Sequence, residues 1–310
     1  LKAYYAKEEG KVISTSIDKY IYVVIKRQIG IVEHKYRINW SKSEFKNTID
    51  EIEHPIVKEA LRIFEIDFPI EVTTFSDIPG QTGLGSSSAF AVGLVHALHA
   101  LKGEIVSKNT IAASAAHIEV DILGRSMGKQ DHYASAYGNL NIFTFNKDET
   151  VTVEPVPYNP EVRSLIEKNL LLFYLRSKRN ASKILEIQEK NTPQIFNNLT
   201  ELKNFVDPIR NIFSSGEDIN KFGDFLNQSW EIKKSLTDAI SNSEIDNYYK
   251  EALDSGAIGG KLLGAGGGGF LLLYVEKKNQ QSVISKLSNL FHLNVGFDQD
   301  GTRITYYDQS

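Results

Sequence analysis

A stretch rich in glycine and serine, residues 77–88, limits more than any other feature how this chain can fold. It reads Asp-Ile-Pro-Gly-Gln-Thr-Gly-Leu-Gly-Ser-Ser-Ser and lies between a predicted strand (68–75) and a predicted apolar helix (86–101). Its three glycines allow the backbone to turn sharply and to approach a ligand closely. Its serines begin the helix, where free N–H groups and the positive end of the helix dipole favour a phosphate. We therefore expect a phosphate-binding loop rather than a plain glycine turn capped by serine.

Two common phosphate-binding patterns do not match this loop. A Walker loop requires a lysine after its last glycine, whereas Ser86 follows Gly85 here. The dinucleotide fingerprint requires Gly-x-Gly-x-x-Gly, whereas the spacing here is Gly-x-x-Gly-x-Gly. The serine hydroxyls could also bind Mg²⁺, a cation that prefers oxygen ligands.

Composition narrows the class of protein further. The chain has 310 residues and no cysteine, which excludes disulfides, thiolate metal sites and cysteine nucleophiles. Its formal net charge of −4 gives no bias toward nucleic acid or a membrane surface. No apolar stretch approaches the roughly 20 residues of a membrane-spanning helix. We expect a cytoplasmic protein, a monomer or homodimer, with no nucleic-acid or membrane partner.

A second predicted helix (108–123), with Ser107 as its N-cap, carries the next candidates. Glu119 lies in this apolar helix and, from composition alone, would most simply face solvent. Asp121 could compete with it for a role, but lies about 200° away around the helix axis. His117 is most simply a packed helical histidine.

Residues 124–138 follow this helix and predict a shaped loop. Lys129 and Asp131 lie close together in it, and a carboxylate there could take a proton from a substrate hydroxyl. Lys129 could hold a phosphate oxygen. The alternative is that both side chains only face solvent on the surface of the loop.

The first loop resembles the central motif of the GHMP small-molecule kinases, the family of galactokinase, homoserine kinase and mevalonate kinase. The family pattern Pro-x-x-x-Gly-Leu-Gly-Ser-Ser-Ala matches residues 79–88, with Ser88 where alanine is common. The resemblance implies that the loop wraps the triphosphate of ATP and that Ser87 and Glu119 hold Mg²⁺. It also implies that Asp131 abstracts the substrate proton, with Lys129 beside it as a second catalytic residue. The nucleotide-binding residues it implies are Pro79, Gly80, Gln81, Gly83, Leu84, Gly85, Ser86, Ser87 and Ser88.

A second glycine-rich stretch, residues 259–270, precedes a predicted strand (270–275). A dinucleotide loop follows its strand, so this order also argues against that type of site. The stretch is similar to the third GHMP motif, Lys-x-x-Gly-Ala-Gly-Gly-Gly-Gly. The resemblance implies that this loop supports the first one and that Gly266, Gly267 and Gly268 line the substrate site.

The resemblance also implies the fold, an α+β protein with the two-domain GHMP kinase architecture. We expect an N-terminal domain like ribosomal protein S5 domain 2 over residues 1–155 and a ferredoxin-like C-terminal domain over residues 156–310. Three prolines between residues 155 and 160 suit a connection there. Helical periodicity in the second half predicts long helices over roughly 181–206, 217–241 and 244–254, and a last strand is predicted at 302–307.

One motif of the family is absent. GHMP kinases open with Pro-x-Arg-Ile/Leu-x-Phe-x-Gly-Gly-Gly-Thr/Ser-Asp, whereas this chain starts Leu-Lys-Ala-Tyr-Tyr, which resembles what directly follows that motif. We expect the natural protein to carry a short segment before Leu1.

The segment around Asp131 is close to one branch of the family, the bacterial D-glycero-D-manno-heptose 7-phosphate kinases and their fucokinase-like relatives. His132 stands where this branch more often has glutamine, and Asn139 where it has a glycine. After a predicted strand, Lys178 and Arg179 would suit the phosphate of a phosphosugar, together with Arg176; the alternative is a solvated basic turn. In the same branch, Trp230, Lys233 and Lys234 on a long helix approach the site.

The implied function is ATP- and Mg²⁺-dependent transfer of a phosphoryl group to the anomeric hydroxyl of a sugar phosphate, D-glycero-D-manno-heptose 7-phosphate, in nucleotide-activated heptose synthesis. A fucokinase-like or other sugar 1-kinase is the alternative of the same class. A non-catalytic protein of the same fold that senses sugar and ATP is the alternative of a different class.

Overall fold

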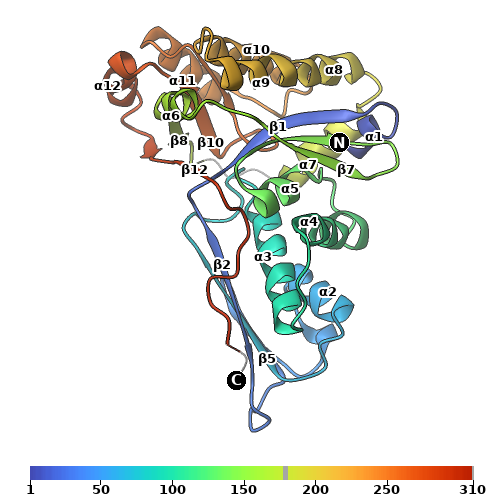
Figure 1. Cartoon of the computed structure of the whole chain (residues 1–310). Helices are drawn as coiled ribbons and strands as arrows, with labels where there is room; N and C mark the ends of the chain where they lie inside the picture. The colour runs from blue at the N-terminus through green and yellow to red at the C-terminus, as the bar shows by residue number, and fades with distance from the viewer. Residues whose placement is uncertain (177–180, 309–310) are drawn as a thin grey trace. The chain divides into compact units, whose positions relative to one another are not determined.

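The structure is a computed structural model and describes residues 1–176 and 181–308 (Figure 1). The chain divides into two compact units, each built from segments far apart in the sequence. Unit 1 comprises Leu1–Asp18, Gln81–Leu84 and Asn139–Asp298, and unit 2 comprises Lys19–Gly80, Gly85–Gly138 and Gln299–Ser310. Helices and sheets mix in both units, as an α+β fold requires. The domain boundary at residues 155/156 stays a prediction, because packing groups the chain by contact rather than by a single cut.

Unit 2 is built on a four-stranded sheet in the order β2-β5-β3-β4. Strand β5 is antiparallel to β2 and parallel to β3, and β3 is antiparallel to β4. Helix α3 packs on β2, and α4 and α5 pack against α3 (Figure 1). Because α3 meets a strand on one side and helices on others, it is apolar around most of its circumference. The elements are β2 (Ile21–Arg27), β3 (Tyr36–Asn39), β4 (Ser43–Lys46), η1 (Ile49–Glu51), α2 (Pro55–Ile63), β5 (Ile70–Ser76), α3 (Ser86–Leu101), α4 (Lys108–Ala116), η2 (His117–Ile122) and α5 (Gln130–Tyr137).

The predicted helix over 108–123 forms as two segments of different geometry. Its N-cap is confirmed, since the Ser107 hydroxyl accepts a hydrogen bond from the Thr110 N–H at 3.1 Å. Beyond Ala116 the helix widens into the π-helical segment η2. Such segments are rare and often occur at functional sites, and this one carries Glu119.

Unit 1 contains two four-stranded antiparallel sheets, in the orders β12-β1-β6-β7 and β11-β8-β10-β9. Its helices include α10, which packs on β9 and β10. The fully buried side chains of Trp230, Phe173 and Leu271 belong to one core there. The elements are α1 (Lys2–Tyr5), β1 (Gly10–Ile17), β6 (Leu140–Phe145), β7 (Val151–Pro155), α6 (Pro160–Lys168), β8 (Leu170–Tyr174), α7 (Ala181–Lys190), α8 (Phe196–Asn204), α9 (Val206–Ser215), α10 (Lys221–Ser235), α11 (Ser243–Asp254), β9 (Gly259–Leu262), β10 (Phe270–Tyr274), α12 (Lys277–Lys286), β11 (Phe291–Leu293) and β12 (Phe297–Asp298).

The secondary-structure prediction is wrong in three places. The helix predicted over 181–206 is split into α7 and α8 by a turn that contains Pro193, because proline cannot continue a helix. The loop predicted over 124–138 is partly helical, since α5 begins at Gln130. No strand forms over 302–307. Across the described residues, none of the helices has the length and apolar character needed to cross a membrane.

Candidate active site

The start of α3 presents backbone donors, as the sequence predicts for a phosphate-binding loop. Gly85 is the N-cap residue, with a left-handed φ of 68°. Its carbonyl accepts the hydrogen bond of the Ala89 N–H at 2.9 Å. The N–H groups of residues 86–88 precede this bond and have no helical carbonyl within reach. They can therefore bind an anion at the positive end of the helix.

Asp131 lies directly against this helix start. A Cβ atom placed on Gly85 would lie 3.1 Å from the Cβ of Asp131 and 3.2 Å from its Oδ2. Any side chain larger than glycine's would therefore displace the carboxylate. Asp131 itself lies in the first turn of α5. The fold thus brings the predicted base and the predicted phosphate loop into contact.

Three side chains of unit 2 meet at the carboxylate of Glu119, which is fully buried. Its Oε1 accepts hydrogen bonds from the Ser87 hydroxyl and from Nη1 of Arg125. The same Nη1 lies 2.8 Å from the Ser87 hydroxyl oxygen. On the other side, Nε2 of His132 lies 2.9 Å from Glu119 Oε2. Both carboxylate oxygens therefore have donors.

These contacts keep Glu119 ionised. Burial alone would raise the pKa of Glu119, because a charged carboxylate loses its hydration. The hydrogen bond and charge of His132, followed by Ser87 and Arg125, outweigh that effect and lower the pKa below its ordinary value. Glu119 is thus a carboxylate at neutral pH despite its burial.

Ser87 and Glu119 have the chemistry of a Mg²⁺ site. They offer a hydroxyl and a carboxylate oxygen in mutual contact, and both are hard oxygen ligands of the type that Mg²⁺ prefers. Among the described residues, no group of three or more His, Asp or Glu side chains could hold a metal ion by itself. A Mg²⁺ ion at this pair would therefore need further oxygen ligands from water or from a bound phosphate.

The other acidic candidate on η2 is not part of this cluster. Asp121 forms a pair with His117, at 2.9 Å between Oδ2 and Nδ1, and both side chains are well exposed. The interpretation of His117 as a packed histidine is therefore wrong.

Ser88, where the family has alanine, is buried, and its hydroxyl has no hydrogen-bond partner within the described part of the chain.

The two glycine loops touch within unit 1, through the short segment 81–84. A Cβ on Gly264 would lie only 2.7 Å from the Cα of Gly83, and one on Gly269 only 2.3 Å from the carbonyl oxygen of Thr82. Thr82 is itself buried. Glycines in the second loop are thus required where backbone packs directly on backbone.

The glycines predicted to line the substrate site have other neighbours. A Cβ on Gly266 would lie 2.8 Å from the Cα of Ile240, and the N–H of Gly267 donates to the Ile240 carbonyl at 2.7 Å. Nζ of Lys233 donates to the carbonyls of Leu262 and Gly264, at 3.0 and 2.6 Å. Lys233 therefore braces the start of the second loop, a role that its sequence position did not indicate.

The remaining predicted residues are placed as follows. Arg176 is exposed at the end of β8, whereas Lys178 and Arg179 lie outside the described residues. Asn139 has a φ of 52°, a left-handed value that glycine adopts most readily. Trp230 is fully buried, and Lys234 forms an ion pair with Glu231 at 2.9 Å.

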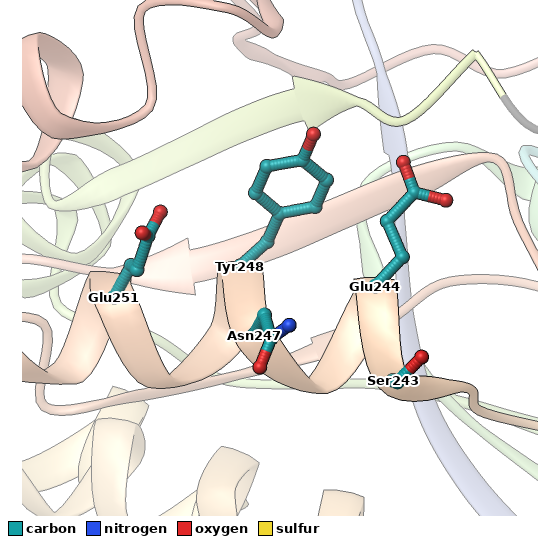
Figure 2. Close-up of a pocket in the computed structure, with 5 residues that line it drawn as sticks. All are labelled: Ser243, Glu244, Asn247, Tyr248 and Glu251. Atoms are coloured by element: carbon teal, nitrogen blue, oxygen red, sulfur yellow. The ribbon is translucent and has the colours of Figure 1, made fainter.

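A separate hollow lies along α11 and has a volume of about 300 Å³. Figure 2 shows Glu244, Tyr248 and Glu251 on the same side of this helix. Two carboxylates on one wall would repel a polyphosphate, so this hollow does not suit a nucleotide. Its lining residues are Ser243, Glu244, Asn247, Tyr248 and Glu251.

The sequence analysis did not predict that Arg125 and His132 would contact Glu119. The available signal was indirect: a buried carboxylate needs donors, and both residues follow Glu119 within one short segment. The substitution of histidine for the more common glutamine at position 132 was visible, but not its partner.

Comparison with known proteins places this geometry in a family. The models for the GHMP kinases N terminal domain and the GHMP kinases C terminal match residues 55–139 and 205–293, more than half of the chain together. A D-glycero-alpha-D-manno-heptose 7-phosphate kinase from Campylobacter jejuni is 27% identical over 93% of this chain and 88% of that protein. A galactokinase from Pyrococcus furiosus is 26% identical over 67% and 64%.

The fold comparison agrees. The crystal structure of a D-glycero-D-manno-heptose 1-phosphate kinase from Bacteriodes thetaiotaomicron matches with a TM-score of 0.75 and 22% identity, over 96% of this chain and 92% of that one. These similarities support sugar kinase activity, with ATP as the phosphate donor. The chain belongs to the GHMP kinase family and is a phosphotransferase with an alcohol group as acceptor.

Proposed function

We propose that this protein transfers the γ-phosphoryl group of ATP to the anomeric hydroxyl of D-glycero-D-manno-heptose 7-phosphate. The observation that carries the proposal is the contact between Asp131 and Gly85 at the start of α3. It places a carboxylate beside the backbone donors that would hold the transferring phosphate. The similarity to a heptose 7-phosphate kinase over most of both chains supports the choice of sugar.

In this mechanism Asp131 accepts the proton of the sugar hydroxyl. The hydroxyl oxygen forms a bond to the γ-phosphorus, the bond from that phosphorus to the bridging oxygen breaks, and ADP leaves. The N–H groups at the start of α3 stabilise the charge on the phosphate oxygens. Lys129 directly precedes α5 and is a further cation that would bind a phosphate oxygen.

Ser87 and Glu119 would hold Mg²⁺, which in kinases neutralises charge on the phosphates. The phosphate of the sugar would require cations of its own. We assign that role to Lys178 and Arg179, with Gly266, Gly267 and Gly268 allowing close approach of the sugar.

The test is ADP release measured with a panel of acceptors: heptose 7-phosphate, free heptose, fucose, galactose and mevalonate. The expected result is the highest kcat/KM with heptose 7-phosphate, and a new anomeric phosphate in the ³¹P NMR spectrum of the product. A preference for fucose would favour a fucokinase-like enzyme instead. No turnover with any acceptor by the full-length protein would contradict the proposal and favour a sugar sensor.

A further inference from the structure

Arg125 contacts both predicted Mg²⁺ ligands, Ser87 and Glu119, yet neither the family resemblance nor the proposed mechanism assigns it a role. Its guanidinium is permanently charged, and Nη1 contacts both the Ser87 hydroxyl and Glu119 Oε1. These are the same two oxygens that would bind Mg²⁺. A guanidinium nitrogen and a metal ion cannot occupy one position between them. The two cations must therefore compete.

The second partner of Glu119 does not resolve this competition. His132 contacts Oε2, the other oxygen of the carboxylate, and its side chain is fully buried. It can stay in place whichever cation is bound at Oε1. His54, also in unit 2, is partly buried, and burial lowers its pKa, so it is neutral near pH 7. Arg125 is thus the exchangeable positive charge at Oε1.

The Arg125 side chain also has space in which to move and N–H groups with which to bind a new partner. It lies in the connection between η2 and α5, which contains no helix or strand, and a third of its side chain is exposed. The preceding residue, Gly124, has a φ of 60° and open space where a Cβ would lie. A guanidinium carries five N–H donors, and Nη1 alone makes both contacts described here. Its planar fork suits a phosphate.

We propose that Arg125 is a tethered counter-ion of the divalent-cation site, which holds Ser87 and Glu119 before the cation binds and then moves to the nucleotide phosphates. The proposal rests on the kinase function proposed above and adds to it a positioning residue for the nucleotide. It explains how a fully buried carboxylate remains compensated while its metal is absent. It also predicts opposite effects of Arg125 on the bare cation and on the cation–nucleotide complex.

The first test is binding of Mn²⁺, a paramagnetic substitute for Mg²⁺, followed by electron paramagnetic resonance without nucleotide or sugar. Arg125→Gln should bind Mn²⁺ roughly tenfold tighter than the wild type, because a charged hydrogen-bonded competitor is gone. Adding Glu119→Gln should remove that gain. Lys102→Gln is the matched control, since it removes one positive charge of unit 2 from an exposed side chain that is not among the Glu119 contacts. Equal or weaker Mn²⁺ binding by Arg125→Gln would overturn the proposal.

The second test is calorimetric titration of β,γ-imido-ATP in saturating Mn²⁺. Here Arg125→Gln should bind roughly tenfold more weakly than the wild type, because the phosphates lose a partner. Nucleotide affinity unchanged from the wild type would contradict the transfer to phosphate, and loss of both affinities would indicate a purely structural role.

Arg125→Lys decides the question if circular dichroism shows that the glutamine variant does not fold. Lysine keeps the charge but not the fork, so Mn²⁺ alone should bind a few-fold more tightly and the nucleotide complex a few-fold more weakly. No change in either titration would overturn the proposal. Neither experiment contains a sugar, so failure of the acceptor panel would leave their outcome interpretable, and the reverse holds as well.

Discussion

The two glycine loops differ in what they contribute to the structure. The first loop delivers chemistry at the start of α3, where N–H groups, the Ser87 hydroxyl and the neighbouring Asp131 are presented together. The second loop contributes close backbone packing, with Gly264 and Gly269 against residues 82–83. One loop therefore presents polar groups beside a carboxylate, and the other lets main chains approach closely. Substitutions in the two should fail in different ways, as loss of turnover in one and loss of stability in the other.

The largest effect is expected from Asp131→Asn, which keeps the shape of the side chain and removes its basicity. Turnover should fall by about 10³-fold, within the usual range for loss of a positioned general base. Binding of β,γ-imido-ATP should stay within a few-fold of the wild type, because the loop donors remain. The coupled ADP assay and a nucleotide titration measure the two quantities. A variant that retained its rate would show that Asp131 is not the base.

Gly264→Ala should instead lower the stability of the fold. The added Cβ would lie 2.7 Å from the Cα of Gly83 in a left-handed conformation, so the backbone must shift. We expect a loss of about 2–4 kcal/mol in the free energy of unfolding, from the strained φ and the overpacking together. Urea denaturation measures it.

Gly103→Ala is the matched control for this substitution. Its φ of 73° is similarly left-handed, but no atom lies within 4 Å of the added Cβ. It should cost only about 1 kcal/mol. Equal losses for the two variants would show that contact between the loops contributes nothing.

Lys233→Met tests the brace on the second loop. The variant loses two hydrogen bonds from a charged donor to the carbonyls of Leu262 and Gly264. Because the donor is partly exposed, we expect a loss of about 1 kcal/mol of stability. The neighbouring Lys234→Met removes partly exposed ion pairs with Glu231 and Asp246 and a distant contact over the Trp230 ring, and should change stability by only about 0.5 kcal/mol. Indistinguishable urea midpoints for the two variants would rule out the brace.

Features that depend on local sequence, such as the start of a helix, could be predicted, whereas contacts between distant residues could not. Backbone features follow local rules: the glycine spacing and the serines at residues 86–88 predict where α3 starts, and Ser107 predicts the start of α4. The split of the helix predicted over 181–206 was also local, since Pro193 was visible and underweighted. This error therefore arose from a misjudged local propensity and not from tertiary packing.

Partners between distant residues could not be derived in this way. Glu119 looked like a solvent-facing glutamate by composition, and only the resemblance assigned it a metal site. Its burial depends on how η2 packs among helices and strands, which no local pattern encodes. Arg125 and His132 become its partners through that packing alone. The resemblance therefore singles out Glu119 from the sequence as a candidate, whereas its two partners emerge only from the packing.

The smallest expected effect is a change with pH in the stability that the ionised Glu119 gains from Arg125 and His132. The pKa of Glu119 is lower in the folded protein than in the unfolded chain, so the unfolded state binds its proton first as the pH falls. The stabilising contribution is therefore present above the ordinary value of 4.5 and is lost as the pH falls below it, through the folded value. Urea denaturation of the wild type and Glu119→Gln should show a stability difference in favour of the wild type at pH 7 that shrinks below pH 4.5. A difference that stayed constant across this range would mean that Arg125 and His132 contribute packing to the Glu119 cluster rather than charge.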